Sequence, residues 1–265
     1  MAIVPITKAS FGNKRFKRNL TYHFAGQDSI APLALSEVTR AMLHLPIGFA
    51  KVKDDWMPVA LQGLSAKKNL FVVPSGRWVG RYIPICYRFQ PFVLASTDEN
   101  KQVLCYDDAS DLLSDSEGEP FFDAQSNPSE VVSGILSFLG QHFQNLQATR
   151  RLCAVLDQHG LLTQWSIKLQ DHESAKQAML SGLYRVDEEA FNQLDAPTLG
   201  VLHQAGALPL IYAQLLSIQN LALLGQVSKE YQSALKRAAM PNQPVSEQPD
   251  MTFLADDTTI SFEGL

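Results

Sequence analysis

Apolar residues recur at helical spacing through the second half of the chain, and one run is much longer than the others. It opens at Asn127-Pro128, an N-cap acceptor followed by proline at the first helical position, with Glu130 three residues after the asparagine. Apolar side chains follow at positions 132, 136, 139, 143, 146 and 153, and Gly160 supplies a stop signal. The spacing predicts a helix of about thirty residues, roughly 45 Å long, that forms the spine of the fold.

Shorter helical patterns flank this long one. Asp187 is an N-cap residue before two glutamates, Pro197 opens a run that Gly206 ends, and Pro209 opens a strongly apolar run. We predict helices over residues 36–44, from 187, over 197–205, from 209 to about 221, and around 226–240.

The first half shows short apolar runs separated by turn residues. We predict strands over 70–74 and 77–83 around a Ser75-Gly76 turn, a hairpin of 91–95 with 101–106, and a further strand over 165–169. Residues 107–120 are acidic and polar and predict a loop. The fold class expected is α+β: a β-rich half, about residues 1–125, packs on a helical half, about residues 127–240, as one domain.

The composition is that of a globular protein, and the net positive and net negative charges lie at opposite ends of the chain. Apolar residues make up 46% of the chain, and the net charge of −5 gives no general attraction to nucleic acid. Residues 1–20 carry a charge of +5, and residues 241–265 carry −5 together with three prolines. These ends are either solvated flanks or segments that attract each other or a partner. We predict that residues 241–265 form an acidic tail outside the domain.

Cysteine usage and apolar patterning predict a cytoplasmic protein without a membrane span. The three cysteines are odd in number and far apart, which favours reduced thiols: Cys86, Cys105 and Cys153. The N-terminus places its short apolar stretch before Lys8, the reverse of the order in a signal peptide. The most apolar stretch, residues 205–224, contains polar Gln214, Gln219 and Asn220.

Known catalytic and metal-binding motifs are absent from the sequence. The histidines form no HExxH or HxH pattern, and there is no GxSxG, GxxxxGK or GxGxxG. We therefore predict no catalytic residue, no metal and no cofactor. Two weaker candidates remain. The acidic loop that ends at Gly118 could suggest calcium, but a calcium loop would place Leu113, which has no ligand oxygen in its side chain, at the first ligand position. Cys86 could be a nucleophile because its neighbours Arg81 and Arg88 favour a thiolate, but its apolar surroundings favour a packed thiol.

An ordered series of short motifs resembles the SapC family of bacterial proteins. The resemblance spans roughly residues 1–225 and rests on LPIGF at 45–49, LQGL at 61–64, NLF at 69–71, GRW at 76–78, RYIP at 81–84, YRFQPF at 87–92, GLYRVD at 182–187 and LIYAQLLS at 210–217. One departure is that family members often carry paired arginines before the Pro-Phe, whereas this chain has Arg88 followed by Phe89. The family takes its name from surface-layer loci, and its members resemble proteins encoded beside outer-membrane receptors and halogenase-like proteins. That association implies accessory work in surface-protein or peptide handling and no particular reaction.

Arginines alternate with aromatic residues between Gly76 and Phe92, which makes this segment the candidate ligand site. The residues are Arg77, Trp78, Arg81, Tyr82 and Arg88. In a strand, Arg77 and Arg81 would share one face, and guanidinium groups beside aromatic rings suit a carboxylate or phosphate. The alternative is that these arginines stack on neighbouring rings or cap backbone carbonyls, with no ligand involved. The function expected is a non-enzymatic protein that binds a peptide or protein; an enzyme with an unrecognised site and a surface-layer component remain alternatives.

Overall fold

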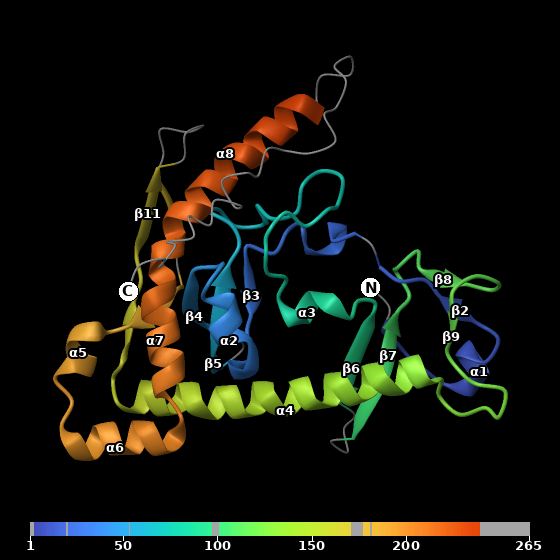
Figure 1. Cartoon of the computed structure of the whole chain (residues 1–265), viewed down its shortest axis with the longest axis horizontal. Helices are drawn as coiled ribbons and strands as arrows, with labels where there is room; N and C mark the ends of the chain where they lie inside the picture. The colour runs from blue at the N-terminus through green and yellow to red at the C-terminus, as the bar shows by residue number, and fades with distance from the viewer. Residues whose placement is uncertain are drawn as a thin grey trace, which may run out of the picture.

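A computed structural model describes residues 3–19, 21–52, 54–96, 101–170, 177–180 and 182–238. One long helix, α4 (Glu130–Gln158), runs beneath two separate sheets and connects the two parts of the molecule, as Figure 1 shows. The fold class is α+β, as the sequence predicts, with a β-rich first half and a helical second half that contains the long helix. The tail expected over residues 241–265 lies outside the described residues.

The larger sheet lies at the centre of the main core and has five antiparallel strands in the order β10-β13-β4-β5-β3. The sequence prediction missed its two longest strands, β4 (Ile47–Val52) and β5 (Asp55–Leu61), whose residues are almost all buried. The helical half also contributes to this sheet, because Tyr184 of β13 pairs with Phe49 of β4. The remaining strands are β3 (Ile30–Pro32), β10 (Leu162–Gln164) and β13 (Tyr184–Val186).

A second core forms around aromatic side chains at the other end of α4. The predicted hairpin is confirmed as β6 (Phe92–Ser96) and β7 (Gln102–Asp107), with β1 (Ile3–Pro5) on the outer side of β7. The loop expected over 107–120 contains two short strands that pair with β2 (Arg15–Phe16), namely β8 (Leu113–Ser114) and β9 (Glu119–Pro120). We call the buried side chains here the aromatic cluster: Phe11, Phe16, Phe92, Leu104, Tyr106, Phe121 and Val132.

The long helix begins two residues later than predicted. Its N-cap is Ser129, whose hydroxyl accepts a hydrogen bond from the backbone N–H of Val132, and Gly160 follows its end with a positive φ of 66°. The buried stripe is confirmed at Val132 and Cys153. It is wrong at Leu136, which is 39% exposed; after Val132, the buried residues of α4 all lie near its C-terminal end, at Thr149, Leu152, Cys153 and Leu156.

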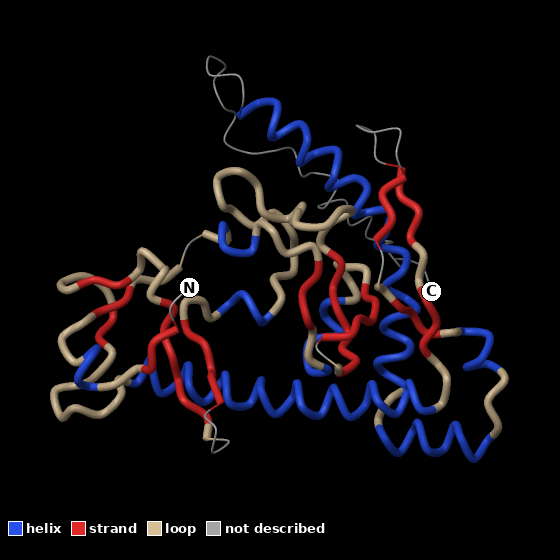
Figure 2. The backbone as a smooth tube through the Cα atoms, turned by 180° about the vertical axis from the view of Figure 1, so that it is seen from behind, coloured by secondary structure: helices blue, strands red, loops and turns tan. Residues whose placement is uncertain are grey.

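Most of the shorter helices occur where the sequence predicts them. Figure 2 shows how helices and strands are arranged along the backbone. The apolar run from Pro209 is one helix, a single 3₁₀ turn, η2 (Ile218–Asn220), and a further helix. The fold also contains two short helical elements, η1 (His23–Ala25) and the four-residue α1 (Lys8–Phe11). A separate hairpin pairs β11 (Ile167–Gln170) with β12 (Gln177–Leu180). The helices are α2 (Leu35–Ala41), α3 (Ile85–Arg88), α5 (Glu188–Asn192), α6 (Ala196–Ala205), α7 (Leu208–Ser217) and α8 (Leu221–Ala238).

The run from Leu208 to Leu235 is long and apolar enough to cross a membrane by length and composition. Its polar side chains nevertheless bind the larger sheet. Gln214 donates to the carbonyl of Ile47 at 3.1 Å and accepts from the N–H of Val186 at 3.0 Å, and Ser217 accepts from the N–H of Ile47. These contacts hold α7 against the larger sheet. The absence of a membrane span stays a prediction.

The strands expected over 70–74 and 77–83 are wrong. Only a single bridge, between Val72 and Trp78, joins these two runs, and the rest of the segment is irregular. Cys86 lies in the one-turn helix α3 and not in an extended run. The reason is that Gly80 and Pro84 interrupt the segment: a Cβ at Gly80 would lie 2.8 Å from the Trp78 ring, and Pro84 sets the start of α3.

Candidate functional site

A buried carboxylate organises the segment that contains the candidate arginines. Glu37, in the first turn of α2, is 1% exposed. One of its oxygens accepts a hydrogen bond from the backbone N–H of Ala34 at 3.0 Å. The other accepts from the Tyr82 hydroxyl at 2.7 Å and from the backbone N–H of Ile85 at 2.9 Å. A buried carboxylate needs several such donors to offset its desolvation, so Glu37 fixes residues 82–85 against α2.

Arg88 and Arg40 lie next to this carboxylate network. The guanidinium of Arg88 lies over the Tyr82 ring, 5.1 Å from its centroid, and its Nε donates to the carbonyl of Ile83 at 2.8 Å. Burial raises the pKa of Tyr82, the charge and hydrogen bond of Glu37 raise it further, and the positive charges of Arg88 and Arg40 oppose this rise. Arg88 therefore contacts Tyr82 directly, and Arg40 lies three residues after Glu37, the partner of Tyr82, in α2.

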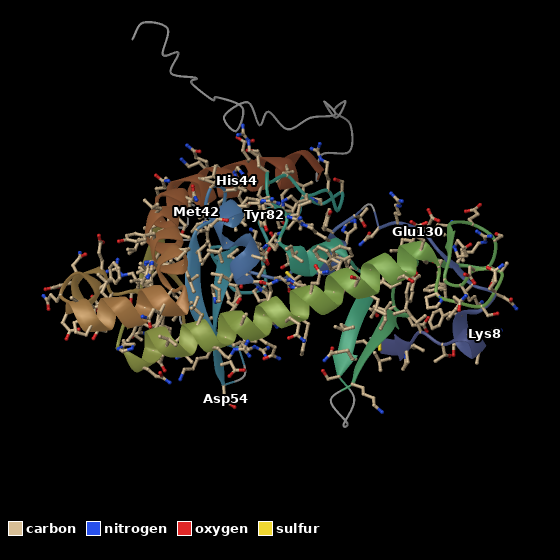
Figure 3. All side chains as sticks on the ribbon, turned by 60° about the horizontal axis from the view of Figure 1, so that its bottom comes forward. Lys8, Met42, His44, Asp54, Tyr82 and Glu130 are labelled. Atoms are coloured by element: carbon tan, nitrogen blue, oxygen red, sulfur yellow. The ribbon has the colours of Figure 1, made fainter. Side chains whose placement is uncertain are left out.

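Arg81 and His44 extend the same surface. Burial lowers the pKa of His44, and the positive charge of Arg81 lowers it further. His44 and Tyr82 are labelled in Figure 3. Beside His44, the Leu43 side chain is 62% exposed. We call Arg40, His44, Arg81 and Arg88 the basic patch. Within the described residues, no carboxylate oxygen lies within 4 Å of the three arginines of this patch.

The structure brings only part of the predicted site together. Arg81 and Arg88 are exposed and belong to the basic patch, whereas Tyr82 is 7% exposed and bound to Glu37. Trp78 is 8% exposed and stacks on Phe71, with ring centroids 5.5 Å apart. Arg77 is exposed on the preceding turn, where its carbonyl accepts from the N–H of Val73. The expected sharing of one strand face by Arg77 and Arg81 is wrong, because no strand forms there.

Sequence reasoning missed Arg40 and His44. Both fall in the helix predicted over 36–44, four residues apart, and side chains at that spacing lie on one face of a helix. This four-residue spacing is the feature of the sequence that could have identified Arg40 and His44 as neighbours. What the sequence does not give is that the segment containing Arg81 lies against α2, where Tyr82 and the N–H of Ile85 bind Glu37.

Phe89, at the position where the resemblance leads us to expect a second arginine, packs on the long helix. Its ring stacks on Phe138 of α4, with centroids 4.4 Å apart and an interplanar angle of 27°. The position therefore contributes to packing in this chain, and Arg88 is the arginine of the pair that remains exposed.

The other resemblance motifs also form a buried polar network. The Tyr87 hydroxyl and the Asn69 amide both donate to the side-chain oxygen of Gln62, at 2.9 and 3.2 Å. Asn69 also donates to the carbonyl of Ala25 and accepts from the N–H of Phe71. The polar groups of an irregular loop lack the hydrogen bonds that a helix or sheet would supply, so these side-chain bonds take their place. The motif residues here therefore hold the 62–73 segment in place.

The nucleophile interpretation of Cys86 has little physical support. Burial raises the pKa of its thiol, and the negative charges of Glu37 and Asp28 raise it further, while Arg88 opposes this only weakly. The thiolate is the reactive form of cysteine, and this environment disfavours it. The three cysteines are free, which agrees with the prediction of unpaired thiols.

The acidic loop pairs with the basic N-terminal segment. Asp115 binds Lys14, Glu117 binds Lys17 at 2.6 Å and Glu119 lies 3.9 Å from Arg18. These pairs give the loop carboxylates partners other than calcium. In the described part of the chain, no group of three or more histidine, cysteine, aspartate or glutamate side chains is arranged to hold a metal ion.

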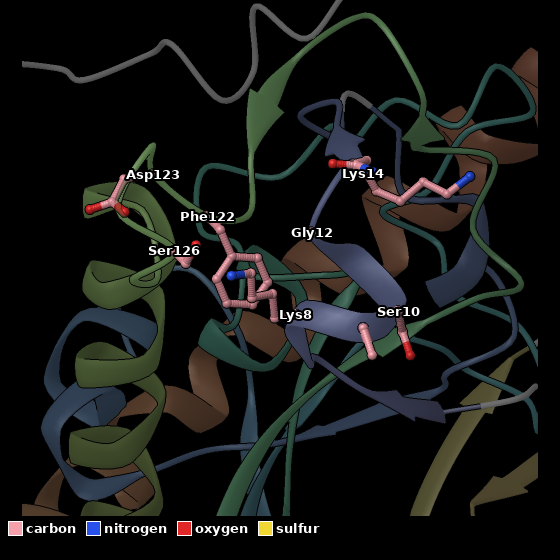
Figure 4. Close-up of a pocket in the computed structure, with 9 residues that line it drawn as sticks. Lys8, Ser10, Gly12, Lys14, Phe122, Asp123 and Ser126 are labelled. Carbon is pink, nitrogen blue, oxygen red and sulfur yellow. The ribbon is translucent and has the colours of Figure 1, made fainter.

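Two open hollows lie elsewhere on the surface. The first, of about 490 Å³, is formed by α1 and the turn at 123–126, with Lys8, Lys14 and Asp123 at its edge (Figure 4). Two of these charges already have partners: Lys14 binds Asp115, and Asp123 accepts from the N–H groups of Gln125 and Asn127. The second, of about 610 Å³, lies beside α5, and three of its nine lining residues are the acidic residues at the start of that helix, Asp187, Glu188 and Glu189. Neither brings convergent reactive groups together.

Comparison with known proteins gives one family match. A family model described as SapC matches residues 6–224. No curated protein and no solved structure matches the chain significantly.

Proposed function

This chain belongs to the SapC family, and from that premise we propose that it is a non-enzymatic accessory protein that binds an acidic segment of a peptide or protein partner at the basic patch. The family resemblance points to a bacterial system that handles surface proteins or peptides. The proposal includes a cytoplasmic location, with which the three free cysteines are compatible.

The observation that carries the proposal is the grouping of Arg40, Arg81 and Arg88 without a carboxylate partner among the described residues. The protein as a whole is acidic, with a net charge of −5. Arginine guanidinium groups bind carboxylates through two parallel hydrogen bonds, and an exposed group of them attracts an acidic segment. Leu43, which precedes His44 in the chain, is exposed and offers an apolar contact.

The test is selection of binding peptides from a random displayed library on the immobilised protein. We expect the selected peptides to be enriched in aspartate and glutamate. Arg81→Lys keeps the charge but loses the planar donor fork, so we expect it to weaken binding about tenfold with little change in melting temperature. Arg77→Lys, on the neighbouring turn, is the matched control and should leave binding unchanged. Selected peptides without acidic enrichment, or equal binding by the Arg81→Lys protein, would refute the assignment of this patch.

The two alternatives give different results in simple experiments. If the protein is an enzyme, incubation with its selected peptides should change their mass, and mass spectrometry detects that change. If it is a surface-layer component, fractionation of cells should recover it from the cell surface. We expect unchanged peptides and recovery from the cytoplasmic fraction.

A further inference from the structure

The acidic C-terminal segment and the basic patch carry complementary charges in the same chain. Residues 241–265 contain five acidic residues and no basic one, so the segment accounts for the whole net charge of −5. It also contains apolar side chains between the acids: Met251, Phe253, Leu254, Ile260 and Phe262. The segment thus has the two properties that suit a surface of arginines beside the exposed Leu43.

The basic patch is a better receptor for this segment than the basic N-terminus. Lys14, Lys17 and Arg18 already pair with Asp115, Glu117 and Glu119. An acidic segment would have to displace these carboxylates to bind there. The arginines of the basic patch require no such exchange within the described residues.

The described chain ends close to the loop that leads to the patch. α8 packs on residues 70–79: Val227 and Tyr231 lie against Leu70, Val73 and Val79. The Lys68 ammonium also lies over the Tyr231 ring, 4.8 Å from its centroid. Residues 239–265 follow, and an extended chain gains about 3.3 Å per residue, so even the first acid, Glu247, can lie about 30 Å from Ala238. A domain of this size has a radius of gyration of about 18 Å, so chain length does not prevent docking.

We propose that residues 241–265 bind the basic patch of their own chain and compete there with the partner. The inference rests on the proposed function, since it makes the tail an internal substitute for the acidic partner. Because a tethered segment acts at an effective concentration of about millimolar, even weak binding in cis would reduce the affinity for the partner. Salt would screen the exposed ion pairs between the tail and the basic patch and would therefore release the tail.

The experiment compares full-length proteins and a fluorescent synthetic peptide of residues 245–265. In one variant the five tail acids are neutralised by Glu247→Gln, Asp250→Asn, Asp256→Asn, Asp257→Asn and Glu263→Gln. A control variant with Thr252→Ala, Thr258→Ala and Thr259→Ala changes the same segment without changing its charge. Anisotropy should show that the neutralised protein binds the peptide about tenfold more tightly than the wild type and the control. Adding Arg81→Gln to the neutralised protein should remove that gain.

Each outcome has one interpretation. Equal peptide affinity for the wild-type and neutralised proteins would overturn docking of the tail. If library-selected acidic peptides bind both proteins equally and the tail peptide binds neither, the tail inference fails while the proposed function stands. If no acidic peptide binds any of the proteins, both fail. A photo-crosslinker at position 253 should label residues 40–44 or 81–88 of the same chain; labelling of residues 14–18, or of a second copy only, would also overturn the inference.

Discussion

At the scale of single residues, the motifs that resemble the family mainly hold irregular backbone in place. Glu37 binds Tyr82 and the N–H of Ile85, and Gln62 binds Tyr87 and Asn69. The sequence predicted that arginines and aromatic rings between 76 and 92 act together. In the structure most of the aromatic rings are buried, and Arg88 lies over the Tyr82 ring and donates to the carbonyl of Ile83, as the ligand-free alternative expects. Arg77 and Arg81 are exposed.

The hydrogen bond from Tyr82 to Glu37 should contribute measurably to stability. Tyr82→Phe keeps the ring but removes the hydroxyl that donates to a buried carboxylate, so we expect a loss of about 1.5–3 kcal/mol in the free energy of unfolding. Tyr212→Phe is the matched control, because the Tyr212 side chain is exposed and its ring contact with Phe191 is retained. Its effect should stay within about 0.5 kcal/mol. Equal midpoints for the two variants in urea denaturation would contradict the role of Glu37.

The proximity of Arg81 and His44 predicts a change in the titration of the imidazole. Arg81→Gln removes a positive charge that disfavours imidazolium, so the pKa of His44 should rise towards its ordinary value of about 6.5. NMR titration of the histidine ring protons measures this directly. A histidine pKa that is lowered by folding gives stability that is present above pH 6.5 and is lost as pH falls, so the variant should lose less stability in acid.

Arg77→Gln serves as the control for this titration. Its position on the preceding turn should leave the pKa of His44 where it is in the wild type. Equal shifts in both variants would mean that the basic patch includes Arg77 and that its limits are wrong.

At the scale of elements, strong local signals predicted the helices and the hairpin. Asp187 and Asp195 cap α5 and α6, and Gly206 ends α6 in the left-handed conformation, with a φ of 75°. The prediction missed β4 and β5 because Gly48 lies within the first and Pro58 within the second, and both residue types argue against a central strand. Strands 70–74 and 77–83 had favourable composition, but packing of Trp78 against Phe71 and the position of Gly80 override it.

The buried face of α4 can be tested with two leucines of the same helix. Leu156 is fully buried, so Leu156→Ala should cost about 2–5 kcal/mol. Leu136, which the sequence pattern placed on the buried stripe, is exposed, and Leu136→Ala should cost less than about 1 kcal/mol. Leu139 is partly buried against the aromatic cluster, so its substitution should fall between them. A larger effect at position 136 than at 156 in chemical denaturation would show that the helix is rotated from this arrangement.

At the scale of the whole molecule, two hydrophobic cores share one helix. The N-terminal end of α4 contributes Val132 to the aromatic cluster, and its C-terminal end contributes Leu152 and Leu156 to the main core. The sequence predicted one domain over residues 1–240, and this remains a prediction. Two cores on one helix behave as one domain only if that helix transmits the loss of one core to the other.

The distribution of tryptophan makes this coupling measurable. The three tryptophans of the chain, Trp56, Trp78 and Trp165, all belong to the main core, so tryptophan fluorescence reports on that core alone. Phe121 is fully buried in the aromatic cluster, 4.8 and 4.9 Å from the ring centroids of Phe11 and Phe16. We expect Phe121→Ala to cost about 3–5 kcal/mol and, if the chain is one cooperative unit, to lower the fluorescence midpoint in urea as much as the far-UV circular dichroism midpoint. Leu136→Ala is the control on the shared helix and should move neither midpoint by a comparable amount. An unchanged fluorescence midpoint beside an early circular dichroism transition would place a domain boundary between the two cores, within α4, because only a helix that unravels between them would let the aromatic cluster unfold while the tryptophans stay buried.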